Sequence, residues 1–163
     1  MAGKSADATS TPPTPEAQLR GFIAKMDSKD QALFRAVRSA VRRRLPTANE
    51  LVYDYPGNLV ISYTPTELGK EGILSLAGRP GDLRLYFGNG PRLPDPKKLL
   101  MGSAGMVRYV PVESARRLAN PHIEALIAGA IARSGVPLAT KGRGAVVIKK
   151  DGASQRPRGK PKK

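Results

Sequence analysis

The spacing of apolar residues changes twice along the chain. Between residues 15 and 45, apolar side chains recur every three or four positions, which is the period of one helix face. Between residues 51 and 110 they form five short runs rich in Val, Ile, Leu and Tyr, namely LVYDY, NLVISY, GILSLA, DLRLYF and GMVRYV. Helical spacing returns from residue 121 to 134. The pattern therefore predicts two helices, five strands, a short helix and a long helix, in that order.

Capping residues mark where the predicted helices begin. Thr14-Pro15 and Asn120-Pro121 each place an N-cap residue before a proline, whose missing N–H costs nothing at the first helical position. Ser28, with Gln31 three residues later, indicates a capping box at the start of the second helix. The long C-terminal helix is expected to bury one apolar row against the sheet, made of Ile123, Leu126, Ile127 and Ile131.

The turns between the strand runs favour antiparallel pairing. PGN and GRPGD are hairpin-length connections, whereas a parallel crossover needs a dozen or more residues. We therefore predict an α+β domain over residues 15–138, with a five-stranded antiparallel sheet covered by N-terminal and C-terminal helices. The Ser/Thr/Pro-rich arm 1–14 and the basic tail 139–163 are expected to be disordered, because they offer little apolar surface to bury. Deletion of the tail is then expected to leave the folded domain almost unchanged.

Charge is the strongest compositional feature of the chain. The formal net charge is +15, and the tail from residue 139 onward holds nine Lys and Arg against Asp151 alone. Such a tail is expected to contact a polyanion, nucleic acid foremost, without reading base sequence, and a purely solubilising role is the alternative. A second basic surface is predicted on one face of the second helix, where it could contact nucleic acid or an acidic protein partner, and a solvated helix face without a partner is the alternative. The tail candidates are Lys149, Lys150, Arg156, Arg158, Lys160, Lys162 and Lys163, and the helix candidates are Arg35, Arg38 and Arg42.

The stretch LPDPKKLLMGSAG at residues 93–105 raises the question of a phosphate-binding loop. A Walker loop places its glycines before the lysine and a hydroxyl after it, and here that order is reversed. A simpler interpretation has Asp95 capping a short turn that contains Lys97 to Met101 and ends at Gly102. Ligand binding by this loop stays open as the alternative.

Asp54 is the best carboxylate candidate for a small ligand pocket, because it lies between two tyrosines near a tight turn. A purely structural role is the alternative. No catalytic residue, cofactor or metal site is predicted: the chain has no Cys and one His, so the usual zinc ligand sets cannot be assembled, and nothing ties His122 to a serine or carboxylate. The expected neighbours of Asp54 in the pocket are Tyr86, Lys97, Lys98 and Arg108.

The chain resembles the YdhG-like domain family over residues 16–134, through the runs LPDPKKLLMGSAGMVRYVPVES, ELVYDYPGN, YTPTE, ILSLA, DLRLYFGNG and NPHIEALIAGAIA. The resemblance implies an α+β domain with a five-stranded antiparallel sheet, and a frataxin-like iron chaperone role described for one bacterial member. Tyr53 to Pro56 matches a Tyr-x-x-Pro pattern of the family, while Met101 stands where lysine is expected and GSAG replaces a tighter GSG. Frataxin-type iron binding uses an acidic ridge, whereas residues 16–45 carry eight basic and three acidic side chains.

These observations together favour a non-enzymatic cytoplasmic binding module whose basic tail contacts a polyanion. The N-terminus lacks the apolar run of a signal peptide, and no window approaches about 18 apolar residues, so neither export nor a membrane partner is expected. An iron or small-ligand carrier is one alternative, and an enzyme with a small pocket near residues 93–105 is the other. No particular protein partner or oligomeric state is predicted.

Overall fold

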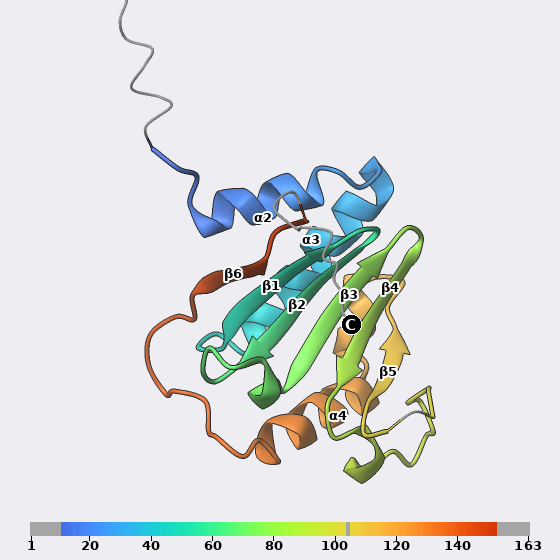
Figure 1. Cartoon of the computed structure of the whole chain (residues 1–163). Helices are drawn as coiled ribbons and strands as arrows, with labels where there is room; N and C mark the ends of the chain where they lie inside the picture. The colour runs from blue at the N-terminus through green and yellow to red at the C-terminus, as the bar shows by residue number, and fades with distance from the viewer. Residues whose placement is uncertain (1–10, 104, 153–163) are drawn as a thin grey trace, which may run out of the picture.

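The computed structural model describes residues 11–103 and 105–152, which form three α-helices and a six-stranded sheet (Figure 1). The α+β class predicted from the sequence is confirmed. The helices are α2 (Pro15–Ile23), α3 (Ser28–Arg44) and α4 (Pro121–Ala132). The strands are β1 (Asn49–Tyr55), β2 (Asn58–Thr64), β3 (Leu74–Arg79), β4 (Asp82–Phe87), β5 (Arg108–Pro111) and β6 (Val146–Lys150). Short 3₁₀ turns occupy Gly69–Glu71, Gly90–Arg92 and Ala115–Ala119.

Side-chain caps begin all three helices. The caps predicted at Thr14 and Asn120 are confirmed, since each side chain accepts a hydrogen bond from a backbone N–H of the first helical turn. The capping box predicted at Ser28 is wrong, because Asp27 precedes it and its Oδ1 accepts from the Asp30 N–H at 3.0 Å. A carboxylate at this position also interacts favourably with the positive end of the helix dipole.

The sheet has the strand order β5-β4-β3-β2-β1-β6. Strands β1 to β5 pair antiparallel with their neighbours in sequence, as the hairpin-length turns predict. Strand β6 pairs parallel with β1 at one edge. The prediction of a five-stranded, wholly antiparallel sheet is therefore wrong by one strand.

The sixth strand comes from the segment that was expected to be a disordered tail. Glu50 donates its N–H to the Ala145 carbonyl at 2.8 Å, and the half-buried side chains of Val146 and Ile148 pack against the core. Gly144 permits this approach, since a Cβ there would lie 1.6 Å from a backbone carbonyl oxygen. The average composition of the tail hid the short apolar run AVVI, which covers an otherwise unpaired strand edge. Disorder is thus wrong for β6, while residues 1–10 and 153–163 lie outside the described part of the chain.

One face of the sheet carries the hydrophobic core, and no α-helix of the described residues lies on the other, here named the open face. The segment 69–72, which includes the 3₁₀ turn Gly69–Glu71, covers part of the open face, since Gly69 lies against the Tyr53 hydroxyl and Gly72 against Ser62. Figure 1 looks onto this open face, with α3 passing behind the sheet. In α4, Ile123, Leu126 and Ile127 are buried as predicted, whereas Ile131 is half-buried. None of the described helices is long and apolar enough to cross a membrane.

Candidate functional site

A buried carboxylate links α3 to the sheet. Glu50, near the start of β1, is only 1% exposed and accepts hydrogen bonds from Nε and Nη2 of Arg38 at 2.9 and 2.8 Å. The Tyr63 hydroxyl donates to the same carboxylate at 2.9 Å, and Arg42 Nη1 lies 3.3 Å from Oε1. Burial, reinforced by the neighbouring Glu50 charge, raises the pKa of Tyr63 well above its usual value, so the hydroxyl stays protonated and donates. The Glu50 charge is therefore paired inside the fold.

Arg38 also reaches across to α2. Its Nη1 and Nη2 donate to the two oxygens of Glu16 at 3.0 and 2.9 Å, in the bidentate geometry that suits a guanidinium and a carboxylate. The hydrogen bond from Arg38 lowers the pKa of Glu16, although burial acts in the opposite direction. Burial also disfavours the Arg38 charge, but the hydrogen bonds to Glu50 and Glu16 outweigh it and raise the Arg38 pKa. Arg38 thus ties α2, α3 and β1 together.

These contacts correct the prediction that Arg35, Arg38 and Arg42 form one outward basic stripe. The Arg38 side chain is only 11% exposed and is engaged by two carboxylates. Arg42 is partly buried beside Glu50. Arg35 is exposed, and it has no carboxylate partner within residues 11–103 and 105–152. Of the three predicted arginines, Arg35 is therefore the one whose charge is not already paired with a carboxylate of the described residues.

A cleft of about 530 Å³, here named the arginine cleft, lies between α2, α3 and the segment that leads into β6. Six arginines and one carboxylate line it. Positive charge remains in excess even when Glu50 is counted, which does not line the cleft but pairs with Arg38. The lining residues are Glu16, Arg20, Ile23, Arg35, Arg38, Ser39, Arg42, Arg43, Pro46 and Arg143.

Four of the arginines that line the arginine cleft are exposed, and one of them, Arg20, lies 3.6 Å from Glu16 in an ion pair. The other three differ from it. Arg35 and Arg43 lie on α3, Arg143 precedes β6, and none of them forms an ion pair in the described part of the chain. Arg43 Nη1 donates to Ser39 Oγ at 3.0 Å, which holds its guanidinium along α3. Guanidinium groups bind phosphate and sulfate oxygens through paired, charge-assisted hydrogen bonds. The arginine cleft can therefore hold an anionic group between α3 and Arg143.

The sequence reasoning missed Arg20, Arg43 and Arg143. Arg43 could have been found, because it lies eight residues after Arg35 and hence about two turns further along the same helix. Arg143 gave no such signal, since its place beside α3 depends on the unpredicted strand β6.

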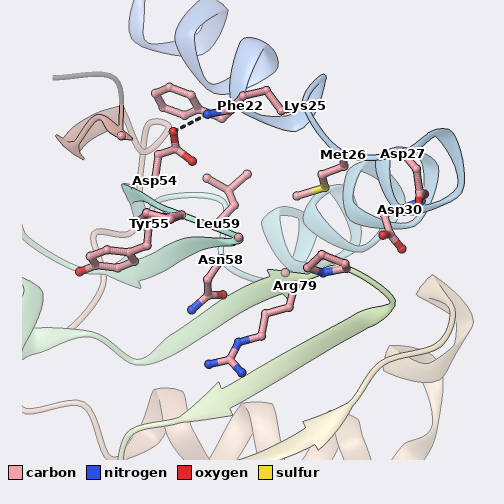
Figure 2. A pocket seen from close by; sticks show the side chains of 15 residues that line it. Phe22, Lys25, Met26, Asp27, Asp30, Asp54, Tyr55, Asn58, Leu59 and Arg79 are labelled. Carbon is pink, nitrogen blue, oxygen red and sulfur yellow. Dashed lines mark hydrogen bonds and ion pairs between the residues drawn. The ribbon is translucent and has the colours of Figure 1, made fainter. Parts of the chain in front are cut away.

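A second cavity, of about 400 Å³, lies where α2 meets α3, beside the β1–β2 and β3–β4 turns (Figure 2). Asp54 is 5% exposed there, and its Oδ2 accepts a hydrogen bond from Lys25 Nζ at 2.8 Å. Phe22, Met26 and Leu59 provide apolar walls. The cavity can accommodate a small, largely apolar molecule, and a cationic group on that molecule would compete with Lys25 for Asp54.

The structure does not bring together the pocket predicted around Asp54. Asp54 lies near the end of β1 and Arg108 begins β5, and the three intervening strands alone separate them by about 19 Å. Tyr86 lies on β4 next to β5, but it pairs with Tyr109 and so faces away from Arg108. Lys97 and Lys98 are exposed in the loop 93–105. The five predicted residues therefore form no common site.

The loop 93–105 contains the turn that was predicted for it, but the turn is shorter. The two carboxylate oxygens of Asp95 accept hydrogen bonds from the N–H groups of Leu99 and Leu100, both at 2.9 Å. Met101 lies outside the turn and forms a bridge with Tyr109 instead. Asp95 therefore satisfies two backbone N–H groups of the loop.

Two of the predicted tail cations belong to the sheet. Lys149 is exposed on β6, and its Nζ donates to the Glu67 carbonyl at 3.2 Å. Lys150 Nζ lies 5.5 Å from the centre of the Tyr55 ring. The remaining tail candidates, Arg156, Arg158, Lys160, Lys162 and Lys163, fall outside the described residues.

Neither metal ligands nor known relatives add to this picture. Among the described residues, no three His, Asp or Glu side chains lie together in an arrangement that could hold a metal ion. No family model, no curated protein and no solved structure matches the chain. The charge and geometry of the arginine cleft are therefore the strongest indication of what the protein binds.

Proposed function

We propose that the protein is a non-enzymatic cytoplasmic module that binds polyanions, nucleic acid foremost, through the arginine cleft and the basic C-terminal tail. Assignment to a YdhG-like, frataxin-like fold is part of the same proposal and rests on the sequence resemblance. One observation carries the proposal: six arginines line the cleft, and the exposed Arg35, Arg43 and Arg143 have no carboxylate partner among the described residues.

The internal ion pairs of Arg38 support anion binding by fixing the walls of the arginine cleft. Because Arg38 is held by Glu16 and Glu50 at once, α2 and α3 keep their spacing before an anion arrives. A preorganised site loses less conformational entropy on binding than one that has to order its side chains. The exposed cations can then engage phosphate oxygens, and the affinity is expected to fall steeply as salt concentration rises.

The two alternative functions have less in their favour. An iron carrier needs a group of carboxylates, and the described residues contain no such group. Where a frataxin-like acidic ridge would lie, α3 presents Arg35 and Arg43. An enzyme site at residues 93–105 would need the predicted partners of Asp54, which the fold keeps apart.

The test is a fluorescence anisotropy titration of a labelled DNA duplex of about 20 base pairs with the full chain. The cleft variant combines Arg35→Gln, Arg43→Gln and Arg143→Gln. The control variant combines Arg92→Gln, Arg116→Gln and Arg133→Gln, which removes the same charge from exposed positions that do not line the cleft.

We expect the cleft variant to lose at least about tenfold in affinity and the control variant to lose about twofold or less. Both variants lower the net charge by the same amount, but only the cleft variant removes guanidinium groups that can donate charge-assisted hydrogen bonds to the bound anion. Equal losses in the two variants would show that only net charge matters. The absence of binding by the parent chain at low salt would contradict the proposed function itself.

A further inference from the structure

We propose that the open face of the sheet, opposite the helices, stacks the unpaired bases of single-stranded nucleic acid. The inference rests on the proposed function, which is that the chain binds polyanions, and it adds the class of nucleic acid that is bound. Proteins hold single strands by combining a positive surface with exposed aromatic rings, since every base has a π face.

Four of the five tyrosines in the chain lie on the open face. Tyr53 and Tyr55 are alternate residues of β1 with nearly parallel rings whose centres are 6.1 Å apart, and Tyr55 is 39% exposed. Tyr86 on β4 pairs with Tyr109 on β5, and their ring centres are 5.3 Å apart. The fifth, Tyr63, is buried on the opposite face against Glu50. Aromatic side chains thus gather on the sheet face opposite the α-helices, where Tyr55 is exposed and the other three tyrosines are half-buried.

The strand register places small side chains between the two tyrosine pairs. One row across the open face runs from Tyr53 through Val60 and Ala77 to Arg84. The next row contains Ser62 and Ser75, followed by the Tyr86–Tyr109 pair. The two tyrosine pairs are therefore three to four strand spacings apart, or roughly 14–19 Å. Ser62 is buried beneath Gly72, whereas Val60, Ala77 and Ser75 are half-buried and form the accessible surface between the pairs. This span can accommodate several consecutive bases of an extended strand.

Cations accompany both tyrosine pairs. The Arg84 guanidinium carbon lies 4.2 Å from the centre of the Tyr109 ring, and Arg84 Nη1 donates to the Tyr86 hydroxyl at 3.3 Å. Lys150 Nζ lies 5.5 Å from the Tyr55 ring centre at the other side of the sheet. Guanidinium planes and aromatic rings are both platforms on which unpaired bases stack. Arg84 is itself paired with Asp82, whose Oδ1 lies 3.1 Å from its Nε, so Arg84 serves as a stacking group and Lys150 supplies charge that attracts a phosphate backbone.

The charge of the chain and the geometry of stacking together select a single strand as the occupant. A chain with a net charge of +15 attracts a polyanion more strongly than it attracts another basic protein. A duplex keeps its bases stacked on one another and shows only their edges in the grooves, whereas an unpaired base can lie flat against a tyrosine ring. Contacts to base faces are tolerant of sequence, so no base preference is expected.

The experiment compares three labelled probes with the full chain by fluorescence anisotropy: single-stranded oligodeoxythymidylate of about 12 nucleotides, a DNA duplex of the same length, and heparin, which has charge but no bases. The stacking variant combines Tyr86→Leu with Tyr109→Leu. The matched control combines Tyr86→Phe with Tyr109→Phe, which keeps both rings. Thermal melting verifies that each variant is folded. Intrinsic tyrosine fluorescence is a second readout, because the chain contains no tryptophan.

We expect the leucine variant to lose roughly five- to hundredfold in affinity for the single strand, the range for removal of one stacked base. Its affinity for heparin and duplex should stay within about twofold, and the phenylalanine control should retain single-strand affinity. Oligodeoxythymidylate should quench tyrosine fluorescence, and heparin should not. If the leucine variant binds the single strand as the parent does, the stacking inference is overturned while the proposed function stands. If the parent binds none of the three probes, the proposed function and the inference both fail.

Discussion

Replacement of Arg38 by methionine tests whether Arg38 stabilises the fold, in contrast to the exposed Arg35 and Arg43 of α3, which we propose bind the anion. Methionine keeps much of the side-chain volume but leaves Glu50, which is 1% exposed, without two hydrogen bonds of 2.8 and 2.9 Å. Removing one partner of a buried ion pair costs about 3–5 kcal/mol. We expect the lower end, about 3 kcal/mol, because Arg42 and the Tyr63 hydroxyl still contact the carboxylate.

At about 2–4 °C per kcal/mol for a chain of this length, the thermal midpoint should fall by roughly 6–12 °C. Circular dichroism melting at neutral pH measures the shift, and Arg35→Met is the matched control. Arg35 is exposed on the same helix without an ion pair among the described residues, so its replacement should change the midpoint by no more than about 2 °C. Equal midpoints for the two variants would refute the assignment of Arg38 to the interior.

Two further predictions concern acid stability and the sixth strand. The pKa of Glu16 is lowered in the folded state from a usual value of 4.5, so its contribution to stability is present above pH 4.5 and is lost as pH falls through the folded pKa. The Glu16→Gln variant should therefore lose less stability than the parent when thermal melting is measured at decreasing pH below 4.5. If the melting temperatures of variant and parent fall equally over this pH range, the prediction is contradicted. Deletion of residues 139–163 should lower the thermal midpoint by roughly 4–8 °C, because it removes half-buried Val146 and Ile148 at roughly 1 kcal/mol each. Deletion of residues 153–163 should change the midpoint by less than about 2 °C, and equal effects of the two deletions would show that β6 contributes nothing.

Local sequence signals predicted most of the fold. The caps at Thr14 and Asn120, the strand runs and the hairpin-length turns each depend on neighbours a few residues apart, and the structure confirms them. Strand β6 was missed because four apolar residues within a Lys- and Pro-rich segment carry too little signal. Their pairing depends on the edge of β1, about a hundred residues earlier in the chain.

The candidate site was less accessible to sequence reasoning. Helical spacing placed Arg35, Arg38 and Arg42 near one another, but spacing does not reveal that Glu16 and Glu50 pair with Arg38. Those two carboxylates belong to different elements, α2 and β1, and only the tertiary fold brings them together. The pocket predicted around Asp54 is wrong because its residues lie on strands that are not neighbours in the sheet. Asp54 is on β1 and Arg108 on β5, and the sequence pattern does not reveal the distance between them.

The most direct test of polyanion binding at the arginine cleft is the salt dependence of duplex DNA binding. Each phosphate contact contributes about −0.9 to the slope of log K against log salt, so loss of Arg35, Arg43 and Arg143 together should make the slope shallower by about 2.7. The control variant lacking Arg92, Arg116 and Arg133 should keep the parental slope, because these residues do not line the arginine cleft. A cleft variant whose slope equals that of the parent would contradict binding at the arginine cleft.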